Sequence, residues 1–336
     1  MQITSLISTL SNERASGVPA NESYRIGQLI AGRYRLSQTL SEGSMGSVWL
    51  ARDLVLDLPV AVKLLHLGTR MSSSDRAYLK DRLIREARVT AAVRHPATVR
   101  VLDYGVTLSA GPYLVMEQLE GQSLGRRIRS AGRVVPERAV QVLLPIADAL
   151  SAVHACGIVH RDVKPDNVFL SRDNHGRIQP KIIDFGLAKL ARTAPSHVLT
   201  GSGVLGTPEY MPPEQVIEPS TVDQRADIWG FSVVLYEMLS GTVPFPGRSC
   251  PEILRSILDR DVPPLTASMG LDASLWAIIE RGLRKDPCER HAAIAEMGER
   301  LADWLSKQSV EEDITGSSLR TQWPPAGSYR PDIPSS

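Results

Sequence analysis

The apolar pattern of the chain changes its period once, at about Ser123. Between Tyr34 and Met116, apolar and polar residues alternate in short runs such as Val60-Ala-Val-Lys-Leu-Leu65. This alternation predicts strands of an antiparallel sheet. After Ser123 the apolar residues recur at helical spacing, as they do from Ala139 to Ala155. The order predicts an α+β chain, with a small sheet-rich part followed by a larger helical part.

Further segments carry the same two patterns. Strand-like alternation is also found in Tyr34 to Leu40, Val48 to Arg52 and Tyr113 to Met116. One helical stretch, about Ser74 to Val93, interrupts the sheet-rich part. The helical part has four more such segments: Ile228 to Leu239, Glu252 to Leu258, Leu275 to Leu283 and Ala292 to Leu305.

The two ends of the chain lack a sustained pattern. The length of 336 residues and the hydrophobic content of 43% suit one large domain or a close pair. Residues 1–33 are polar, which predicts a flexible N-terminal arm. Residues 306–336 are rich in Ser, Pro, Thr and Gly, which predicts a disordered tail, with a docking or autoinhibitory element as the alternative. The folded domain is then 34–305, divided into 34–117 and 122–305.

Charge and cysteine content narrow the class of partner. The chain has 38 basic and 37 acidic residues, a balance that gives no sign of nucleic acid or an anionic membrane as partner. The three cysteines, Cys156, Cys250 and Cys288, share no C-x-x-C spacing, so we expect free thiols in a reducing cytoplasm. No run of about 18 apolar residues occurs, and the first residues lack the features of a secretion signal. We therefore expect a cytoplasmic chain.

Two features of the sheet-rich part are suited to binding an anion. Leu40-Ser-Glu-Gly-Ser-Met-Gly-Ser-Val48 places a glycine-containing turn between two strands, where backbone N–H groups could approach phosphate oxygens. A simple hairpin turn has the same pattern. Lys63 ends an apolar strand, so its ammonium needs a phosphate or carboxylate nearby unless it reaches water.

A polar segment in the helical part points to phosphoryl transfer. His160-Arg-Asp-Val-Lys-Pro-Asp-Asn167 packs six polar groups into eight positions, and Lys181-Ile-Ile-Asp-Phe-Gly186 follows after a short strand. Phosphoryl transfer needs hard oxygen ligands for a metal, a carboxylate to orient the acceptor hydroxyl, and cations to neutralise phosphate charge. The residues that supply this set are Asp162, Lys164, Asn167 and Asp184.

The joint pattern resembles the eukaryotic-like serine/threonine protein kinases of the bacterial type. The resemblance runs from about Tyr34 to about Leu305, with the motifs in the order of that family. It implies a two-lobed protein kinase fold, with a small antiparallel-sheet N-lobe holding one main helix and a larger helical C-lobe. It also implies transfer of the ATP γ-phosphate to Ser or Thr hydroxyls of protein substrates, with Mg²⁺, or Mn²⁺ as an alternative, as the metal.

The resemblance implies an ATP site in the N-lobe. Lys63 would contact the α- and β-phosphates and pair with Glu86 on the one helix of that lobe. Ala61 and the gatekeeper Met116 would line the nucleotide site. The backbones of Glu117 and Leu119 would hydrogen-bond adenine. The loop over the phosphates would be Leu40, Ser41, Glu42, Gly43, Ser44, Met45, Gly46, Ser47 and Val48.

The resemblance also implies the catalytic roles. Asp162 would orient the substrate hydroxyl and accept its proton. Lys164 would neutralise γ-phosphate charge, and a lysine at this place marks Ser/Thr specificity in the family. Asn167 and Asp184 would hold the metal. Thr207 would lie beside Asp162 and Lys164 and help to select a hydroxyl amino acid.

Two further residues would have structural roles, and two positions depart from the family pattern. Glu214 would pair with Arg290, and Asp227 would brace the catalytic loop. Ser41 replaces the first glycine of the phosphate loop, and Pro212 replaces a small residue before Glu214. Neither departure removes a charged catalytic group, so we expect an active enzyme.

Regulation through the activation segment is expected from Arg161, which in the family often binds a phosphate there. The candidate acceptors are Thr193, Ser196, Thr200 and Ser202, and their distance from Thr207 favours Thr200 and Ser202. Autophosphorylation would take place in a transient homodimer. The alternative is a polar loop with incidental hydroxyls. Ser123 occupies a place that is acidic in many kinases that choose basic peptides, which weakens that preference here.

Two rival functions remain at this point. A kinase-like module could hold nucleotide or a partner without turnover. A small-molecule phosphotransferase of related fold is the second rival, and Glu214 with Arg290 argues against it because such enzymes generally lack that pair.

Overall fold

The computed structural model describes residues 24–43, 46–65, 91–107, 111–173, 175–184, 207–265 and 271–324. The chain divides into two compact units. Among the described residues, the first unit holds those up to Arg94 together with Val99–Glu120. The second unit holds His95–Thr98 and the residues from Gly121 on.

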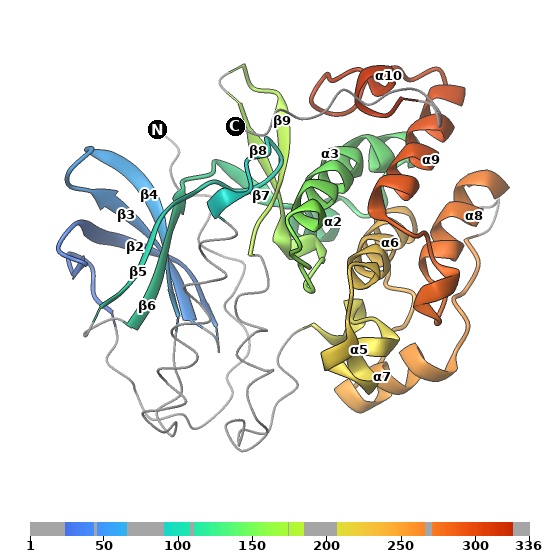
Figure 1. Cartoon of the computed structure of the whole chain (residues 1–336), viewed down its shortest axis with the longest axis horizontal. Coiled ribbons are helices and arrows are strands. Elements are labelled where there is room, and N and C mark those ends of the chain that lie inside the picture. Colours follow the sequence, from blue (N-terminus) through green and yellow to red (C-terminus); the bar gives the residue numbers. More distant parts are fainter. Residues whose placement is uncertain are drawn as a thin grey trace. The chain divides into compact units, whose positions relative to one another are not determined.

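The first unit is built on a six-stranded antiparallel sheet in the order β1-β2-β3-β4-β6-β5 (Figure 1). Alternate residues of its strands, among them Tyr34, Leu36 and Trp49, are buried in one core, as the alternating pattern predicts. The strands are β1 Leu29–Ile30, β2 Tyr34–Gly43, β3 Gly46–Asp53, β4 Leu58–Leu65, β5 Val101–Thr107 and β6 Gly111–Glu117.

The sheet begins before residue 34, so the expected arm of residues 1–33 extends too far. Ile30 pairs with Tyr34 across β1 and β2 and is fully buried. Arg33 joins the fold through a salt bridge of 2.6 Å to Asp53. A strand of two residues is too short to show alternation, which is why the pattern missed it. The helix expected at about residues 74–93 lies almost wholly outside the described residues.

The second unit consists of helices and a small sheet in the order β7-β8-β9. Its strands are β7 Gly121–Ser123, β8 Val168–Arg172 and β9 Ile178–Ile182. Its α-helices are α2 Leu124–Ala131, α3 Pro136–Ala155, α5 Pro213–Ile217, α6 Arg225–Ser240, α7 Cys250–Asp259, α8 Ala273–Gly282, α9 Ile294–Lys307 and α10 Leu319–Gln322. Short 3₁₀ turns are Pro165–Asn167, Pro208–Tyr210, Pro219–Thr221 and Pro287–Glu289.

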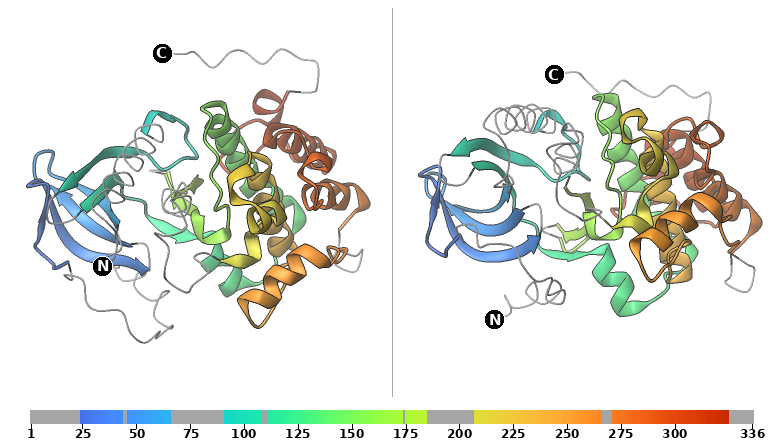
Figure 2. Two further views of the ribbon diagram at one scale, coloured as in Figure 1. Left: turned by 60° about the horizontal axis from the view of Figure 1, so that its bottom comes forward. Right: turned by 90° about the horizontal axis from the view of Figure 1, so that it is seen from below.

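Helices α3 and α6 form the centre of the second unit. Helix α3 packs against α6 and α9, an arrangement visible in both views of Figure 2. Helix α6 is apolar around its whole circumference and is buried along nearly its full length, as expected of a helix with neighbours on every side. Because both helices are held in the core, they fix the positions of the segment that follows α3 and of the segment that precedes α6.

The expected disordered tail 306–336 is wrong for residues 306–324, which are folded. Helix α9 continues to Lys307, and α10 follows it. Leu319 and Trp323 are buried, at 1% and 5% exposure. Trp323 packs on Gly298 of α9, where an added Cβ would lie 2.3 Å from its ring. Composition averages a whole segment, so it hides two large apolar residues that dock on a neighbour.

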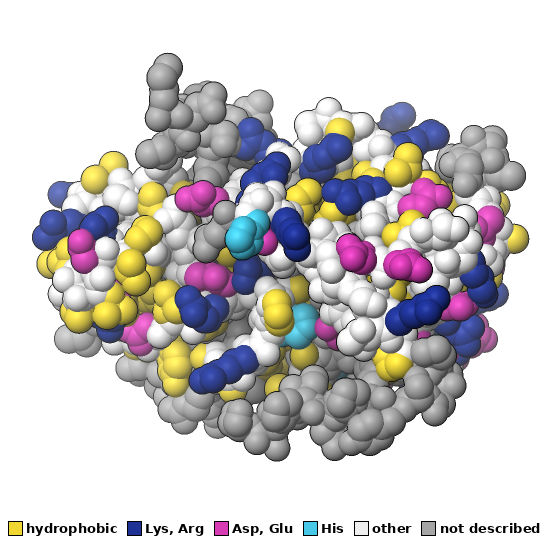
Figure 3. Space-filling view, turned by 90° about the horizontal axis from the view of Figure 1, so that it is seen from above, with side chains coloured by type: hydrophobic (Ala, Val, Ile, Leu, Met, Phe, Trp, Pro, Cys, Tyr) yellow, Lys and Arg dark blue, Asp and Glu magenta, His cyan; other side chains and the backbone are white. Residues whose placement is uncertain are grey.

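The surface carries charges of both signs. Figure 3 shows Lys and Arg side chains interspersed with Asp and Glu on one face. The three cysteines are free thiols. No helix among the described residues is both long and apolar enough to span a membrane.

Candidate active site

The loop after helix α3 is held in place by the buried carboxylate of Asp227. Asp227 on α6 accepts hydrogen bonds from the backbone N–H groups of His160 (2.8 Å) and Arg161 (2.7 Å) and from the His154 ring (2.7 Å). Burial alone would raise the pKa of Asp227, but its hydrogen bond to His154 and the neighbouring imidazoles hold that pKa below its ordinary value. Arg161 has a φ of 62°, a conformation that needs such support. This geometry agrees with the bracing role expected of Asp227.

The same loop brings three of the predicted catalytic residues together. The Lys164 ammonium lies 3.0 Å from Asp162 Oδ2. The Asn167 amide nitrogen donates to Asp162 Oδ2 (2.9 Å) and to the Asp162 carbonyl (2.8 Å). Both hydrogens of that amide are thus used, and its oxygen is the atom that could bind a cation. The Lys164 ammonium and the Asn167 amide therefore both contact Asp162 Oδ2, and together they orient the carboxylate.

Asp184 is brought next to Asn167 by backbone bonds. The Ile183 N–H donates to the Asn167 carbonyl (2.9 Å), and the His160 ring donates to the Ile183 carbonyl (3.1 Å). Asp184 follows directly, with a φ of 59°. An amide oxygen and a carboxylate are hard donors that fit Mg²⁺, which usually takes one or two carboxylates and keeps water and phosphate as its other ligands. Within the described ranges, no group of three or more His, Cys, Asp or Glu side chains could hold a metal ion.

The nucleotide-binding residues predicted on the strands lie in the first unit. Lys63, half-buried on β4, is opposite Val48 on β3 and Leu114 on β6. Ala61 is opposite Met116. The sheet register therefore places Val48, Ala61, Lys63 and Met116 on neighbouring strands.

Glu117 follows Met116 at the end of β6 and is held by Arg100. Its N–H donates to the Arg100 carbonyl (3.0 Å), and its carboxylate accepts from the Arg100 N–H (2.8 Å). A contact of Glu117 with adenine would therefore use its carbonyl oxygen. Leu119 lies two residues further on in the described chain, and its contact with adenine stays a prediction.

Of the two glycines of the predicted phosphate loop, the sheet requires one, Gly46, and does not require the other, Gly43. A Cβ at Gly46, whose φ is 148°, would lie 2.0 Å from the Leu64 carbonyl, so the pairing of β3 with β4 requires glycine there. A Cβ at Gly43 would meet nothing within 4 Å. Gly43 is thus not required by the sheet, and its open backbone is what a phosphate would need. Ser41 lies at a register shift of β2.

The remaining predicted residues are Thr207, which the structure describes, and seven residues that it does not describe. Thr207 is exposed at the start of the 3₁₀ turn Pro208–Tyr210, and its role beside Asp162 stays a prediction. The residues outside the described part are Ser44, Met45, Glu86, Thr193, Ser196, Thr200 and Ser202.

The sequence did not indicate a group of acidic residues near the catalytic loop. Asp166 pairs with Arg129 at 3.2 Å, and Tyr210 donates to Glu237 at 2.6 Å. Burial raises the pKa of Glu237, and the charges of Asp166 and Glu209 act in the same direction. These residues are far apart in the sequence, and no local pattern connects them.

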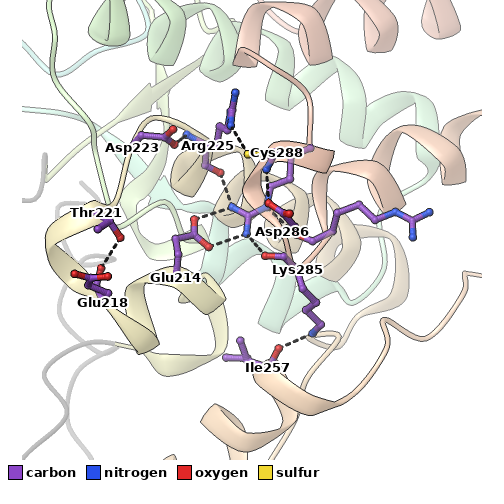
Figure 4. A network of polar contacts seen from close by, with 11 residues as sticks. Glu214, Glu218, Thr221, Asp223, Arg225, Ile257, Lys285, Asp286 and Cys288 are labelled. Carbon is purple, nitrogen blue, oxygen red and sulfur yellow. Dashed lines mark hydrogen bonds and ion pairs between the residues drawn. The ribbon is translucent and has the colours of Figure 1, made fainter.

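The predicted pair of Glu214 and Arg290 is confirmed. The Arg290 guanidinium makes two hydrogen bonds to the Glu214 carboxylate, at 2.8 and 2.7 Å. It also donates to the carbonyls of Arg225 (3.0 Å), Arg284 (2.8 Å) and Lys285 (3.1 Å), as part of the network in Figure 4. Pro212 caps helix α5 in an extended conformation, so it leaves Glu214 in place.

The sheet unit, the helical unit and the loop of Asp162, Lys164 and Asn167 define a protein kinase fold with its catalytic loop. The protein kinase domain family model matches residues 34–301. The chain belongs to the protein kinase domain family, and this membership implies the use of ATP.

The relatives it resembles are bacterial serine/threonine-protein kinases. It is 38% identical over 309 residues to serine/threonine-protein kinase pkn2 of Myxococcus xanthus, covering 89% of this chain and 36% of that protein. It is 38% identical over 272 residues to serine/threonine-protein kinase PknB of Mycobacterium tuberculosis, covering 80% of this chain and 42% of that protein. The chain therefore spans well under half the length of these relatives. The crystal structure of Rad53 1-466 in complex with AMP-PNP has the same fold, with a TM-score of 0.65, 22% identity, and coverage of 82% of this chain and 66% of that one.

Proposed function

We propose that this chain is a serine/threonine protein kinase domain that transfers the γ-phosphate of ATP to Ser or Thr hydroxyls of proteins. The observation that carries the proposal is the orientation of Asp162 by Lys164 at 3.0 Å and by Asn167 at 2.9 Å. A solvated loop would not need this convergence of acid, cation and amide. The names of the relatives and the lysine at position 164 support Ser/Thr as the acceptor.

The chemistry follows from these groups. Asp162 orients the acceptor hydroxyl and takes its proton as the new O–P bond forms and the bond from the γ-phosphorus to the β,γ-bridging oxygen breaks. Lys164 neutralises negative charge on the phosphoryl group in the transition state. Thr207 would contact the acceptor side chain from the start of its 3₁₀ turn.

We propose that Asn167 and Asp184 hold Mg²⁺, with Mn²⁺ as the alternative ion. Their oxygen donors and their adjacency, through the Ile183 to Asn167 hydrogen bond, support this assignment. When bound, the ion neutralises charge on the β- and γ-phosphates.

For the nucleotide, we propose that the segment Leu40–Val48 covers the phosphates and that Lys63 contacts them. Ala61, Met116, Glu117 and Leu119 would surround adenine. Support comes from the sheet register, which sets Val48 opposite Lys63 and Ala61 opposite Met116. Glu86 would pair with Lys63.

We also propose regulation by autophosphorylation at Thr200 or Ser202, with Arg161 as the phosphate's partner and a transient homodimer as the reacting species. Such a kinase would act in the cytoplasm, where ATP is available. Intact-mass and peptide mapping of purified wild type and Asp162→Asn tests this part. Full activity in a variant lacking all four hydroxyls of the segment would contradict it.

The decisive experiment is incubation with labelled ATP, Mg²⁺ and a generic protein substrate, wild type beside Asp162→Asn. We expect phosphoserine or phosphothreonine in the substrate and a rate loss of about 10²- to 10⁴-fold in the variant, since a general base is removed. Equal transfer by both proteins would refute the role of Asp162. A thermal shift with Mg-ATP but no transfer would favour the binding-module rival.

A further inference from the structure

Residues 311–324, which we call the C-terminal strap, lie beyond the part of the chain that the kinase family model covers. The strap has its own hydrogen bonds. The Asp313 carboxylate accepts from the N–H groups of Thr315 (2.7 Å) and Ser317 (3.1 Å), and the Leu319 N–H donates to the Glu311 carbonyl (2.9 Å). Helix α10 of the strap lies beside α9 and α3 in Figure 1. The strap is therefore a folded element with a fixed place on the second unit.

The strap completes helix α3 at a proline. Pro145 lies inside α3 and has no N–H, so the carbonyl of Gln141, four residues earlier, lacks its helical partner. The Ile314 N–H of the strap donates to that carbonyl (3.2 Å). The Gln141 side chain in return donates to the Glu312 carbonyl (2.9 Å). Strap and helix thus satisfy each other's backbone groups.

About two turns along α3 from Gln141, the strap and a histidine from another segment bind the same carboxylate. Gln322 donates to Asp148 Oδ2 (2.9 Å), and the same oxygen lies 3.0 Å from the His95 Nε2 atom. The other ring nitrogen of His95 accepts from the Ala97 N–H (3.1 Å), so Nε2 carries the hydrogen and donates to Asp148. Gln322 and His95 therefore share one carboxylate oxygen, and the position of each depends on the other.

The histidine segment in turn holds strand β9. The Ile182 N–H donates to the Ala97 carbonyl (2.8 Å), and the Lys181 ammonium donates to the Thr98 carbonyl (3.2 Å). Asp184 comes two residues after Ile182. A continuous series of hydrogen bonds thus leads from Gln322 through Asp148, His95 and Ala97 to the end of strand β9, two residues before Asp184.

We propose that the C-terminal strap is a positioning element for Asp184, acting through the shared Asp148 oxygen and segment 95–98. Its importance for metal binding rests on the proposed function, since Asp184 is a metal ligand there. Groups that orient a ligand from behind typically change metal affinity about 10- to 100-fold, and the strap acts through several bonds, so we expect a smaller effect of about two- to fivefold.

Hydrogen exchange of the free protein tests the positioning directly. In Gln322→Leu, the amides of Ala97 and Ile182 should exchange about five- to tenfold faster, as expected for loss of one hydrogen bond. The amides of core helix α6, which report global unfolding, should change less than about twofold. Arg320→Gln, an exposed change on the same helix α10, is the matched control and should alter neither set. Equal acceleration of α6 amides, or no acceleration at Ile182, overturns the proposal.

A variant of the same size separates the hydrogen bond from simple packing. Gln322→Glu keeps the shape of the side chain but places a carboxylate oxygen opposite Asp148 Oδ2, so it should accelerate exchange at Ile182 at least as much as Gln322→Leu. Wild-type exchange at Ile182 in Gln322→Glu overturns the proposal.

Kinetics then test the link to the metal. Gln322→Leu should raise the Mg²⁺ concentration for half-maximal activity about two- to fivefold and reach the wild-type rate at saturation. A lower maximal rate with unchanged Mg²⁺ dependence overturns the link. If the wild-type protein transfers no phosphate, the proposed function fails. The exchange experiment then still tests, by itself, whether the strap positions the segment that leads to Asp184.

Discussion

Removal of Arg290 should be among the most destabilising single changes in the second unit. Its side chain is fully buried, and that of Glu214 is 14% exposed. Arg290→Met would leave the carboxylate buried without its cation, at a cost of about 3–5 kcal/mol. Three carbonyls would lose a donor as well, so we expect a loss in the free energy of unfolding at the upper end of that range, about 5 kcal/mol.

Urea unfolding followed by tryptophan fluorescence measures this loss. Glu214→Leu combined with Arg290→Met should be less destabilised than the sum of the two single variants, because neither charge is then left unpaired. The matched control is Lys307→Gln. Its pair with Asp303 has the same 2.7 Å separation, but the side chains are 70% and 66% exposed. Exposed pairs contribute under about 1 kcal/mol, so this control should stay close to wild type.

Two results would refute the reasoning. One is a loss below about 1 kcal/mol in Arg290→Met, which would mean that water or a rearranged neighbour satisfies Glu214. The other is additivity of the two single variants within about 0.5 kcal/mol, which would mean that the two residues act independently.

Three further predictions follow from the second unit. Burial lowers the pKa of Lys285 to about 8 from an ordinary 10.5. Between these two pH values the unfolded state binds more protons than the folded state, so the free energy of unfolding should rise with pH from about 8 to 10.5. We expect a rise of about 1–2 kcal/mol, after allowance for the partial exposure of the side chain. Urea titrations should show this slope lost in Lys285→Met, and an unchanged slope would contradict it. Gly282→Ala should cost about 1–3 kcal/mol in the free energy of unfolding, because its Cβ would lie 2.0 Å from Ser232 Oγ. Adding Ser232→Ala should restore part of the thermal stability, and no recovery would mean that the clash is with another residue. Tyr210→Phe should cost about 1–3 kcal/mol in the free energy of unfolding, because it removes the hydrogen-bond donor to half-buried Glu237. Adding Glu237→Gln should restore part of this loss, and a calorimetric measurement that shows no recovery would contradict the prediction.

Much of the candidate site could be predicted from the sequence because its groups are close neighbours along the chain. Asp162, Lys164 and Asn167 fall within six residues, so one turn is enough to bring them into contact. The strands β2, β3, β4 and β6 were predicted because alternation over several residues reflects one buried face. The pair of Glu214 and Arg290 was identified through the family resemblance, since no local pattern links residues 76 positions apart.

Other features depend on contacts between distant segments, and only the tertiary structure decided them. Strand β1 is too short to have a period of its own, and it exists because β2 offers it a partner. The C-terminal strap reads as disordered by composition, yet Trp323 docks on Gly298 and Ile314 supplies the hydrogen bond that Pro145 cannot make. The physical reason is that the burial of a side chain and the pairing of a backbone group depend on what lies opposite in space. A sequence states which groups need a partner, and only the packed chain shows which partner each one finds.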